Sequence, residues 1–413
     1  MDIFALAFIR QALKLVYFCR QSFGMDYNYE MLAKTFFGME ALLANELKAL
    51  GAQEVRTGTR LVRFKGDKGF MYKANLCLRT ALKILKPIHF TRVPTQKAFY
   101  DQLYHFPWEE YLGVHQTFAF DAVVLGDHFT HSLYITQRAK DALVDRFRKK
   151  TGQRPSVDLD RPDIRFHIHI HDDRMSLALD TSGASLHKRG YRSATNIAPL
   201  NEVLAAGVLL LSGWEGKAHF LDPMCGSGTL AIEAAMIAAH IPPNINRSEF
   251  AFEKWPDWDE TLFQKIFEAQ LNRTTTPEFS ILASDKAPSA VYKAQDNIKN
   301  ANLDEFIQLE RSNFFHSNKS VEGPLFLVCN PPYGERLTGD MEALYRSFGD
   351  TLKQGYSNTD AWILSSNREA LKSFGLRPKR RIKLYNGKLE ARLAHFPIYE
   401  GSKKSSKPTT HAP

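Results

Sequence analysis

Residues 219–235 read HFLDPMCGSGTLAIEAA, a stretch that predicts a buried strand, a tight turn and a helix. Gly226 and Gly228 carry no Cβ, so the backbone there can turn sharply and approach a ligand closely. The helix expected from Thr229 presents its first amides to the turn, which favours a carboxylate or a phosphate. The stretch therefore predicts a ligand-binding loop at the edge of an α/β sheet.

The acid that precedes the glycines narrows the class of ligand. Ala231 completes a dinucleotide fingerprint, but Asp222 and Pro223 stand at the strand end, where an acid would repel a pyrophosphate. A nicotinamide oxidoreductase should also carry its ribose acid about 20 residues past the glycines. That region here is irregular and contains Pro and Asn. A cationic ligand with one carboxylate, such as S-adenosyl-L-methionine, fits better.

A second motif, Asn330-Pro331-Pro332-Tyr333, follows the apolar run from Leu325 to Cys329, which predicts a buried strand. The prolines fix the backbone and remove two N–H donors, so carbonyl oxygens and the Asn330 side-chain oxygen are available as acceptors. Tyr333 offers a flat face on which a base can stack. The motif suits a planar substrate with an exocyclic amine. The alternative is a Pro-rich turn that caps a strand.

Two further strands end in polar residues. The stretch from Phe279 to Asp285 predicts a strand whose terminal acid can take two ribose hydroxyls. The strand from Ile307 to Glu310 leads to Asn313, Phe314 and Phe315, which suit the edge and face of an adenine. Ordinary strand-end turns are the alternative for both.

Composition bounds the class of protein. The 413 residues suggest two or three domains, and a net charge of +9 favours a polyanionic partner. The four cysteines form no C-x-x-C pair, which argues against a zinc site or disulfides and favours a reducing cytosol. Arg10, Lys14 and Arg20 interrupt the apolar first residues, so no membrane span is expected. Residues 1–28 are interpreted as an extension ahead of a start at Met25, and residues 401–413 as a disordered tail.

The rest of the chain predicts alternating strands and helices. Strands are expected at Leu32–Phe36, Val55–Phe64, Ile88–Phe90, Gln116–Val124, Arg165–His171 and Arg174–Asp180. Helices are expected at Gly38–Gly51, Gly66–Thr80, Gln96–His105, Thr130–Thr151, Asn196–Trp214 and Ala287–Ala301. An Asn-Gly pair at Asn386 predicts a terminal antiparallel hairpin.

In order, the four motifs resemble the class I S-adenosylmethionine-dependent methyltransferases, in the amino-methyltransferase branch with an Asn-Pro-Pro-Tyr motif. The resemblance implies an α/β Rossmann-like sheet that ends in an antiparallel hairpin. It implies that Asn330, Pro331, Pro332 and Tyr333 are catalytic. The implied cofactor-binding residues are Asp222, Pro223, Cys225, Gly226, Ser227, Gly228, Asp285, Lys286, Asn313, Phe314 and Asn330. The adenine-edge position is more often Asp in the family, and Asn313 departs from that.

The amino-terminal half resembles the ferredoxin-like plus THUMP module of certain RNA methyltransferases, on Phe106-Pro107-Trp108-Glu109 and Val157-Asp158. The junction from Asp180 to Arg192, with Ala198-Pro199-Leu200, is similar to that of the bacterial family that methylates the exocyclic amine of guanine in large-subunit (23S) ribosomal RNA. The resemblance implies residues 29–90 as a ferredoxin-like domain, 91–187 as a THUMP RNA-binding domain and 188–400 as the methyltransferase domain. It also implies a cytoplasmic enzyme with an RNA partner, no membrane and no metal, and one modification from one such domain.

Three alternatives stay open at this point. The same chemistry would serve tRNA guanosine N2 or DNA adenine N6, although the amino-terminal module favours RNA. A non-catalytic RNA-binding assembly factor is the third, and the intact loop and Asn330 argue against it.

Several basic and aromatic clusters allow two interpretations. Lys188, Arg189 and Arg192 would bind RNA phosphate or pair with acids between domains. The basic runs Arg146–Lys150 and Arg377–Arg381 would be solvated surface or phosphate contacts. A row of His167, His169 and His171 on one strand face favours a solvated or RNA-facing surface over zinc. The residues Phe252, Trp255 and Trp258 favour a packed insertion core over a substrate cleft.

Overall fold

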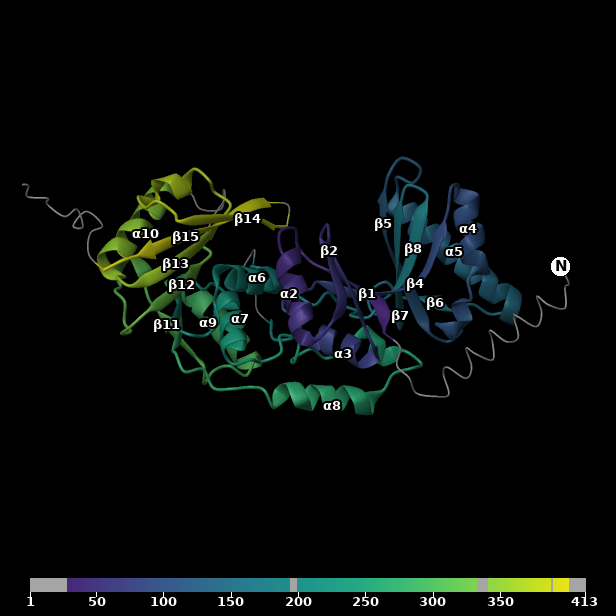
Figure 1. Ribbon diagram of the computed structural model, residues 1–413, viewed down its shortest axis with the longest axis horizontal. Helices are drawn as coiled ribbons and strands as arrows, with labels where there is room; N and C mark the ends of the chain where they lie inside the picture. The colour runs from purple at the N-terminus through teal and green to yellow at the C-terminus, as the bar shows by residue number, and fades with distance from the viewer. Residues whose placement is uncertain (1–27, 194–198, 333–340, 388, 401–413) are drawn as a thin grey trace, which may run out of the picture.

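The computed structural model describes residues 28–193, 199–332, 341–387 and 389–400. Figure 1 shows an elongated molecule in which two sheets lie side by side along the long axis. The amino-terminal sheet holds the strands up to Asp180, and the carboxyl-terminal sheet holds those from His219 onward. Tyr333, the 194–198 segment and both chain ends, including the expected extension and tail, lie outside the described residues.

The first sheet has eight strands in the order β2-β3-β1-β4-β8-β7-β5-β6. Its strands are β1 (Tyr29–Lys34), β2 (Gln53–Gly58), β3 (Leu61–Gly66), β4 (Lys83–Arg92), β5 (Thr117–Leu125), β6 (Ser156–Val157), β7 (Ile164–His171) and β8 (Arg174–Asp180). The helices between them are α2 (Glu40–Leu50), α3 (Lys68–Cys77), α4 (Gln96–His105), the 3₁₀ helix η1 (Trp108–Glu110) and α5 (Ser132–Thr151).

Strand β4 joins the two halves of this sheet. Its first residues pair with β1, where Ile84 lies opposite Ala33. Its later residues pair with β8, where Phe90 lies opposite Ser176. One apolar core therefore runs beneath both halves, from Leu43 on α2 to Leu143 on α5.

The second sheet has seven strands in the order β11-β10-β9-β12-β13-β15-β14. The strands are β9 (His219–Asp222), β10 (Ile281–Asp285), β11 (Ile307–Arg311), β12 (Leu325–Cys329), β13 (Thr359–Ser365), β14 (Arg380–Asn386) and β15 (Leu389–Ile398). The first five run parallel, whereas β15 is antiparallel to both β13 and β14. The expected Rossmann-like sheet with a terminal antiparallel hairpin is confirmed.

Helices cover both faces of this sheet, because successive strand side chains point to opposite sides. Phe220 packs in a core with α6 (Glu202–Ser212), α7 (Thr229–Ala238) and α9 (Pro288–Asn300). The next residue, Leu221, packs in a second core with α10 (Met341–Gly355). The strand order reverses at β9, since the chain continues to β10 on one side and later places β12 on the other. Ligands of open α/β sheets bind at the carboxyl ends of strands at such a point.

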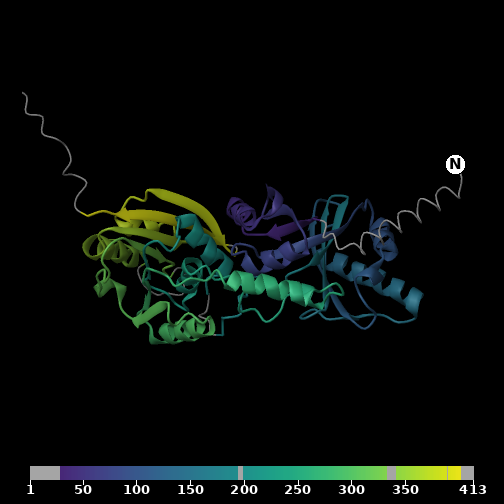
Figure 2. The ribbon, with the colours of Figure 1, turned by 60° about the horizontal axis from the view of Figure 1, so that its bottom comes forward.

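The segment between α7 and β10 belongs in part to the amino-terminal core. It contains the 3₁₀ helix η2 (Ala251–Lys254) and α8 (Glu260–Leu271), and Figure 2 shows α8 lying across the middle of the molecule. Phe252 and Trp255 are buried in the core of the first sheet, and Trp258 packs against it. The prediction of a packed insertion is confirmed. The remaining 3₁₀ helices are η3 (Phe314–His316) and η4 (Ala370–Phe374).

Most expected elements are present, but two predictions were wrong in detail. The single strand expected at Val55–Phe64 is a hairpin of β2 and β3, whose turn includes Arg60 at φ 58°. The helix expected from Asn196 begins only at Glu202, because Asn201 has extended backbone angles and its side chain accepts from the N–H groups of Val203 and Leu204. Within the described ranges, no helix is long and apolar enough to cross a membrane.

Candidate active site and its junction

The loop after β9 turns as the glycines predicted. Gly226 has φ 56° and Gly228 has φ 83°, both in the left-handed region. A Cβ on Gly228 would lie 3.3 Å from the Cβ of Ala294 on α9, so the loop also needs glycine for close packing. The Gly228 N–H donates to the Cys225 carbonyl at 2.8 Å, which closes the turn, and α7 begins at the next residue.

Asp285 at the end of β10 holds this loop. Its carboxylate accepts from the Gly226 N–H at 3.0 Å and from the Ala287 N–H at 2.9 Å. A carboxylate has about four acceptor positions, so these two bonds leave capacity for a ligand. The structure thus gives Asp285 a loop-supporting role that the sequence did not reveal.

The second acid, Asp222, is buried at the end of β9. Its carboxylate is 1 % exposed and accepts weakly from the Met224 N–H, at 3.4 Å. Burial raises the pKa of Asp222 well above its usual range, and the nearby charge of Asp285 raises it further, against the opposing effect of the Met224 N–H. A cation bound nearby would favour the ionised form of Asp222.

A cavity of about 80 Å³ opens beside the loop. It is lined by residues from the ends of four strands and from α10: Pro223, Met224, Asp285, Lys286, Ser312, Asn313, Phe314, Phe315, Pro332 and Leu344. The structure therefore brings together Pro223, Asp285, Lys286, Asn313 and Phe314, which the sequence placed in one site. Asp222, Cys225 and Ser227 are buried, and they do not line the cavity.

The cavity also shows what the sequence reasoning missed. Met224, Ser312 and Leu344 line it but were not predicted as ligand contacts. Met224 and Ser312 stand directly beside predicted site residues, so their position was the available signal. Leu344 comes from α10, far along the chain, and no local pattern marks it.

Asn330 stands where β12 ends. Its Oδ1 atom is buried, and no residue that the structure describes gives it a hydrogen-bond partner. An acceptor buried without a partner costs about 1–3 kcal/mol, so such an atom calls for an explanation, and a role in catalysis is one that the strand-end position of Asn330 favours. Pro332 lines the cavity, which places the motif beside the loop after β9.

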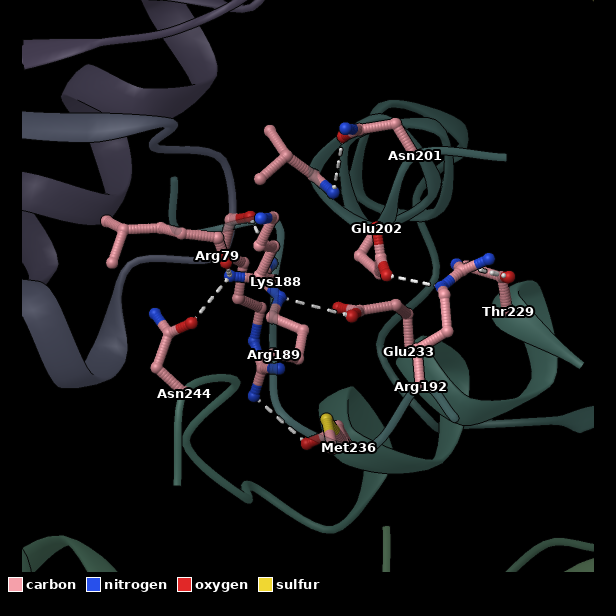
Figure 3. A network of polar contacts seen from close by, with 12 residues as sticks. Arg79, Lys188, Arg189, Arg192, Asn201, Glu202, Thr229, Glu233, Met236 and Asn244 are labelled. Atoms are coloured by element: carbon pink, nitrogen blue, oxygen red, sulfur yellow. Dashed lines mark hydrogen bonds and ion pairs between the residues drawn. The ribbon is translucent and has the colours of Figure 1, made fainter. Parts of the chain in front are cut away.

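Three arginines hold helix α7 along its length (Figure 3). Arg192 donates to the hydroxyl of Thr229, the first residue of the helix, at 3.0 Å. Arg189 forms an ion pair with Glu233 one turn later, at 3.3 Å. Arg79, which follows α3 in the first-sheet unit, donates to the carbonyls of Met236 at 2.9 Å and Ile241 at 2.7 Å.

The pair of Arg189 and Glu233 is fully buried, with neither side chain exposed. Arg189 also donates to Asn244 at 3.2 Å and to the Arg79 carbonyl at 2.6 Å, so it joins the linker to both sheets. Burial raises the pKa of Glu233, and the charges of Arg189 and Arg79 oppose that rise. In the sequence, the signal for a buried ion pair was a single glutamate, Glu233, within an otherwise apolar helical run.

The basic junction is thus divided between the two interpretations that the sequence left open. Arg189 and Arg192 pair with acids, the latter with Glu202 at 2.6 Å. Lys188, which precedes both, is exposed. The row of histidines is divided as well. His167 is 8 % exposed and lies 2.9 Å from the Lys34 ammonium, so the expected solvated surface was wrong at that residue. Burial and this charge lower the pKa of His167 to about 3.

The two basic runs differ in whether their side chains form ion pairs. Arg146 and Lys150 both pair with Glu109, whereas Arg377, Lys379, Arg380 and Arg381 are exposed. Among the described residues, no group of three or more His, Cys, Asp or Glu side chains is arranged to hold a metal ion.

The strand order, the glycine loop after β9 and the polar strand ends define a class I methyltransferase fold. The crystal structure of SMU.472, provisionally named a methyltransferase and solved with SAH, matches with a TM-score of 0.81 and 29% identity. The match covers 92% of this chain and 100% of that chain.

Comparisons of sequence give the family. Residues 189–395 match the RMKL-like methyltransferase domain, residues 30–85 the RlmL ferredoxin-like domain and residues 95–180 the THUMP domain. A Synechocystis sp. protein provisionally named RNA methyltransferase is 34% identical, over 88% of this chain and 95% of its own length. The chain belongs to the family of the RMKL-like methyltransferase domain.

Longer relatives carry a more specific name. The ribosomal RNA large subunit methyltransferase K/L of Syntrophotalea carbinolica is 39% identical over 91% of this chain. The match covers 54% of that relative, so the chain spans about half the length of the curated relatives with this name.

Proposed function

We propose that this protein uses S-adenosyl-L-methionine to methylate the exocyclic N2 amine of a guanosine in 23S ribosomal RNA, in the cytoplasm. The observation that carries the proposal is the buried Asn330 Oδ1, which has no hydrogen-bond partner in the described part of the chain and stands where β12 ends, beside the loop that follows β9. The names of the K/L relatives support the choice of large-subunit RNA.

The residues at the strand ends fit the methyl donor. Asp285 stands beside the loop as an acceptor that suits a ribose, and a bound sulfonium cation would favour the ionised form of the buried Asp222. The amides at the start of α7 suit a carboxylate. The cavity of about 80 Å³ holds only part of such a ligand, which would extend beyond it. SMU.472 was solved with SAH, the demethylated form of this donor.

The bound donor would supply a methyl group already activated by its positive sulfur. The difficulty lies with the acceptor, because the lone pair of a guanine amine is delocalised into the ring. Hydrogen bonds from the NH₂ group to Asn330 Oδ1 and the Pro331 carbonyl would localise that lone pair and direct it. A bond forms between N2 and the methyl carbon as the carbon–sulfur bond breaks, and one amine proton then passes to water. Tyr333 would stack on the base.

We propose that the chain is divided between RNA binding and methyl transfer. Residues 29–90 and 91–187, the ferredoxin-like and THUMP units, would bind RNA, and residues 188–400 would carry the reaction. We propose that the reaction needs no metal ion, because the methyl group of the donor is already activated.

The test compares Asn330→Ala with the wild type. Donor affinity, measured by calorimetry, should change less than about threefold, because the substitution removes an acceptor for the amine. Single-turnover methyl transfer to rRNA from a strain lacking the gene should fall about 10²–10³-fold, the usual effect of losing one oriented polar contact in a transition state. Equal transfer rates in both proteins would contradict the assigned role of Asn330.

A further inference from the structure

A cleft of about 780 Å³ lies at the junction of the two sheets, and the candidate active site does not account for it. Its lining comes from five places: Lys83 at the start of β4, residues 160–165 before and in β7, the linker 183–192, residues 199–202 at the start of α6, and residues 247–254 around η2. The volume is within the range of ligand pockets, about 300–1,000 Å³.

Cationic side chains predominate in the lining. They are Lys83, Arg161, Arg165, Lys188, Arg189, Arg192, Arg247 and Lys254, against the carboxylates of Asp160, Glu202 and Glu249. Three acids behind the lining, Glu233, Asp180 and Asp121, also pair with these cations, so the eight cations exceed the neighbouring acids by about two charges. A small excess of positive charge suits a phosphate backbone.

Most of these cations already serve the fold. Arg189 and Arg192 pair with buried acids, as described above. Arg165 pairs with Asp121. Arg247 donates to four backbone carbonyls in and just before the linker, among them those of Ser185 and Lys188. These residues shape the cleft and supply its field, but they are not available for a ligand without loss of structure.

Two cations remain available. The Arg161 and Lys188 side chains are exposed, line the cleft from different segments and have no ion-pair partner among the residues that the structure describes. Figure 3 places Lys188 next to the Arg189 network. Neither side chain holds the fold together, so each can contact a phosphate at little structural cost.

The cleft adjoins the proposed methyl-transfer site. Arg192 lines the cleft and donates to Thr229, the residue that follows Gly228 of the loop. A strand in the cleft would therefore run from the first sheet toward the loop that holds the donor. Two rings line the cleft, those of Phe250 and His187. Phe250 is stacked on Phe252 and lies against the Arg247 guanidinium, and the half-buried His187 lies 2.9 Å from the Ser185 hydroxyl through its Nδ1 atom. The lining therefore offers few free ring faces, and we expect the cleft to recognise backbone more than bases.

We propose that this cleft binds the phosphates of a single-stranded segment of the RNA substrate next to the methylated nucleotide, with Arg161 and Lys188 as direct phosphate contacts. The inference rests on the proposed function for the choice of RNA. A single strand is favoured because a cleft of this volume does not admit a duplex, and because a base must leave any helix to reach a methyl-transfer site.

The experiment uses the full chain with the substitutions Arg161→Ala and Lys188→Ala together. The matched control carries Lys217→Ala and Lys265→Ala, which remove the same charge from exposed positions outside the cleft. Binding of a 20-nucleotide single-stranded RNA is measured between 50 and 300 mM salt. Loss of two phosphate contacts should lower the slope of log K against log[salt] by about 1.4, and lower affinity roughly 15-fold near 0.15 M salt. The control should change neither quantity beyond about twofold.

Two further measurements separate this proposal from the proposed function. Donor affinity and the maximal transfer rate at saturating rRNA should stay near the wild-type values in the cleft variant, while KM for rRNA rises. If the cleft and control variants bind RNA alike, or the wild type binds no RNA, the cleft proposal is overturned. If the cleft variant loses affinity as expected but the wild type methylates no RNA, the cleft proposal stands and the catalytic one fails.

Discussion

The buried ion pair between Arg189 and Glu233 gives the sharpest prediction about stability. Arg189→Met keeps a long apolar side chain but removes every polar contact of the guanidinium. Glu233 then remains in a fully buried place without its partner. The carbonyl of Arg79 and the side chain of Asn244 lose a donor at the same time.

The cost follows from the charge left behind. Removal of one partner from a buried pair typically costs about 3–5 kcal/mol, because the remaining charge is uncompensated. Total stabilities of about 5–15 kcal/mol make this a large fraction. Replacement of both partners by apolar residues is commonly close to neutral. Arg189→Met combined with Glu233→Met should therefore recover part of the loss, and the remainder should persist because the buried Arg79 guanidinium also loses the charge of Glu233.

The loss should also depend on pH in a defined direction. Burial raises the folded-state pKa of Glu233, and removal of Arg189 would raise it further. A carboxyl with a raised folded pKa costs nothing below its unfolded pKa of about 4.3, where both states are protonated. The penalty then grows as the pH rises toward the folded pKa. The gap between Arg189→Met and the wild type should be smallest near pH 4 and largest at neutral pH.

Urea unfolding of the full chain, followed by tryptophan fluorescence at several pH values, provides the measurement. Lys217→Met serves as control, since that side chain is 82% exposed and its one ion-pair partner among the described residues is the exposed Glu215. The reasoning would be refuted if Arg189→Met unfolded within 1 kcal/mol of the wild type, or if the second substitution at Glu233 deepened the loss instead of relieving it.

Two other changes test the geometry of the linker and the loop. Gly190→Ala should destabilise the chain by about 3 kcal/mol in urea unfolding. The reason is that Gly190 has φ 100° and a Cβ there would lie 1.9 Å from the Asn246 carbonyl oxygen. Gly213→Ala is the control: Gly213 has φ 90° with nothing within 4 Å of an added Cβ, so this variant measures the backbone strain alone and should cost less. Asp285→Ala should weaken donor binding about 10- to 100-fold in calorimetry, because the Gly226 N–H loses a charged acceptor. An unchanged donor affinity would show that the loop holds its shape without Asp285.

The sequence predicted most of the second sheet, though not β13, and much of the site. Apolar runs ending in Asp222, Asp285 and Asn330 predicted strands whose ends meet, and the glycines predicted the turn before α7. These features are local, since a strand end and a turn are each written in a few consecutive residues. Parallel strands then bring their carboxyl ends to one edge.

What the sequence did not predict depends on partners far along the chain. Arg189 and Glu233 are 44 residues apart, and only the packing of the linker on α7 makes them a buried pair. Lys34 and His167 are 133 residues apart and meet because β4 joins the two halves of the first sheet. The hairpin of β2 and β3 was missed because its turn uses Arg60 at positive φ, where glycine or asparagine is the usual signal.

The central claim is methyl transfer to a guanosine amine in large-subunit RNA. The most direct measurement supplies radiolabelled donor to the purified protein with 23S rRNA, tRNA or duplex DNA from a strain lacking the gene, and then identifies the labelled nucleoside. We expect N2-methylguanosine in 23S rRNA, formed about 10²–10³-fold more slowly with Asn330→Ala. Label in tRNA or in DNA adenine would contradict the proposed substrate, and no label in any of the three, with no donor binding, would contradict the proposed activity itself.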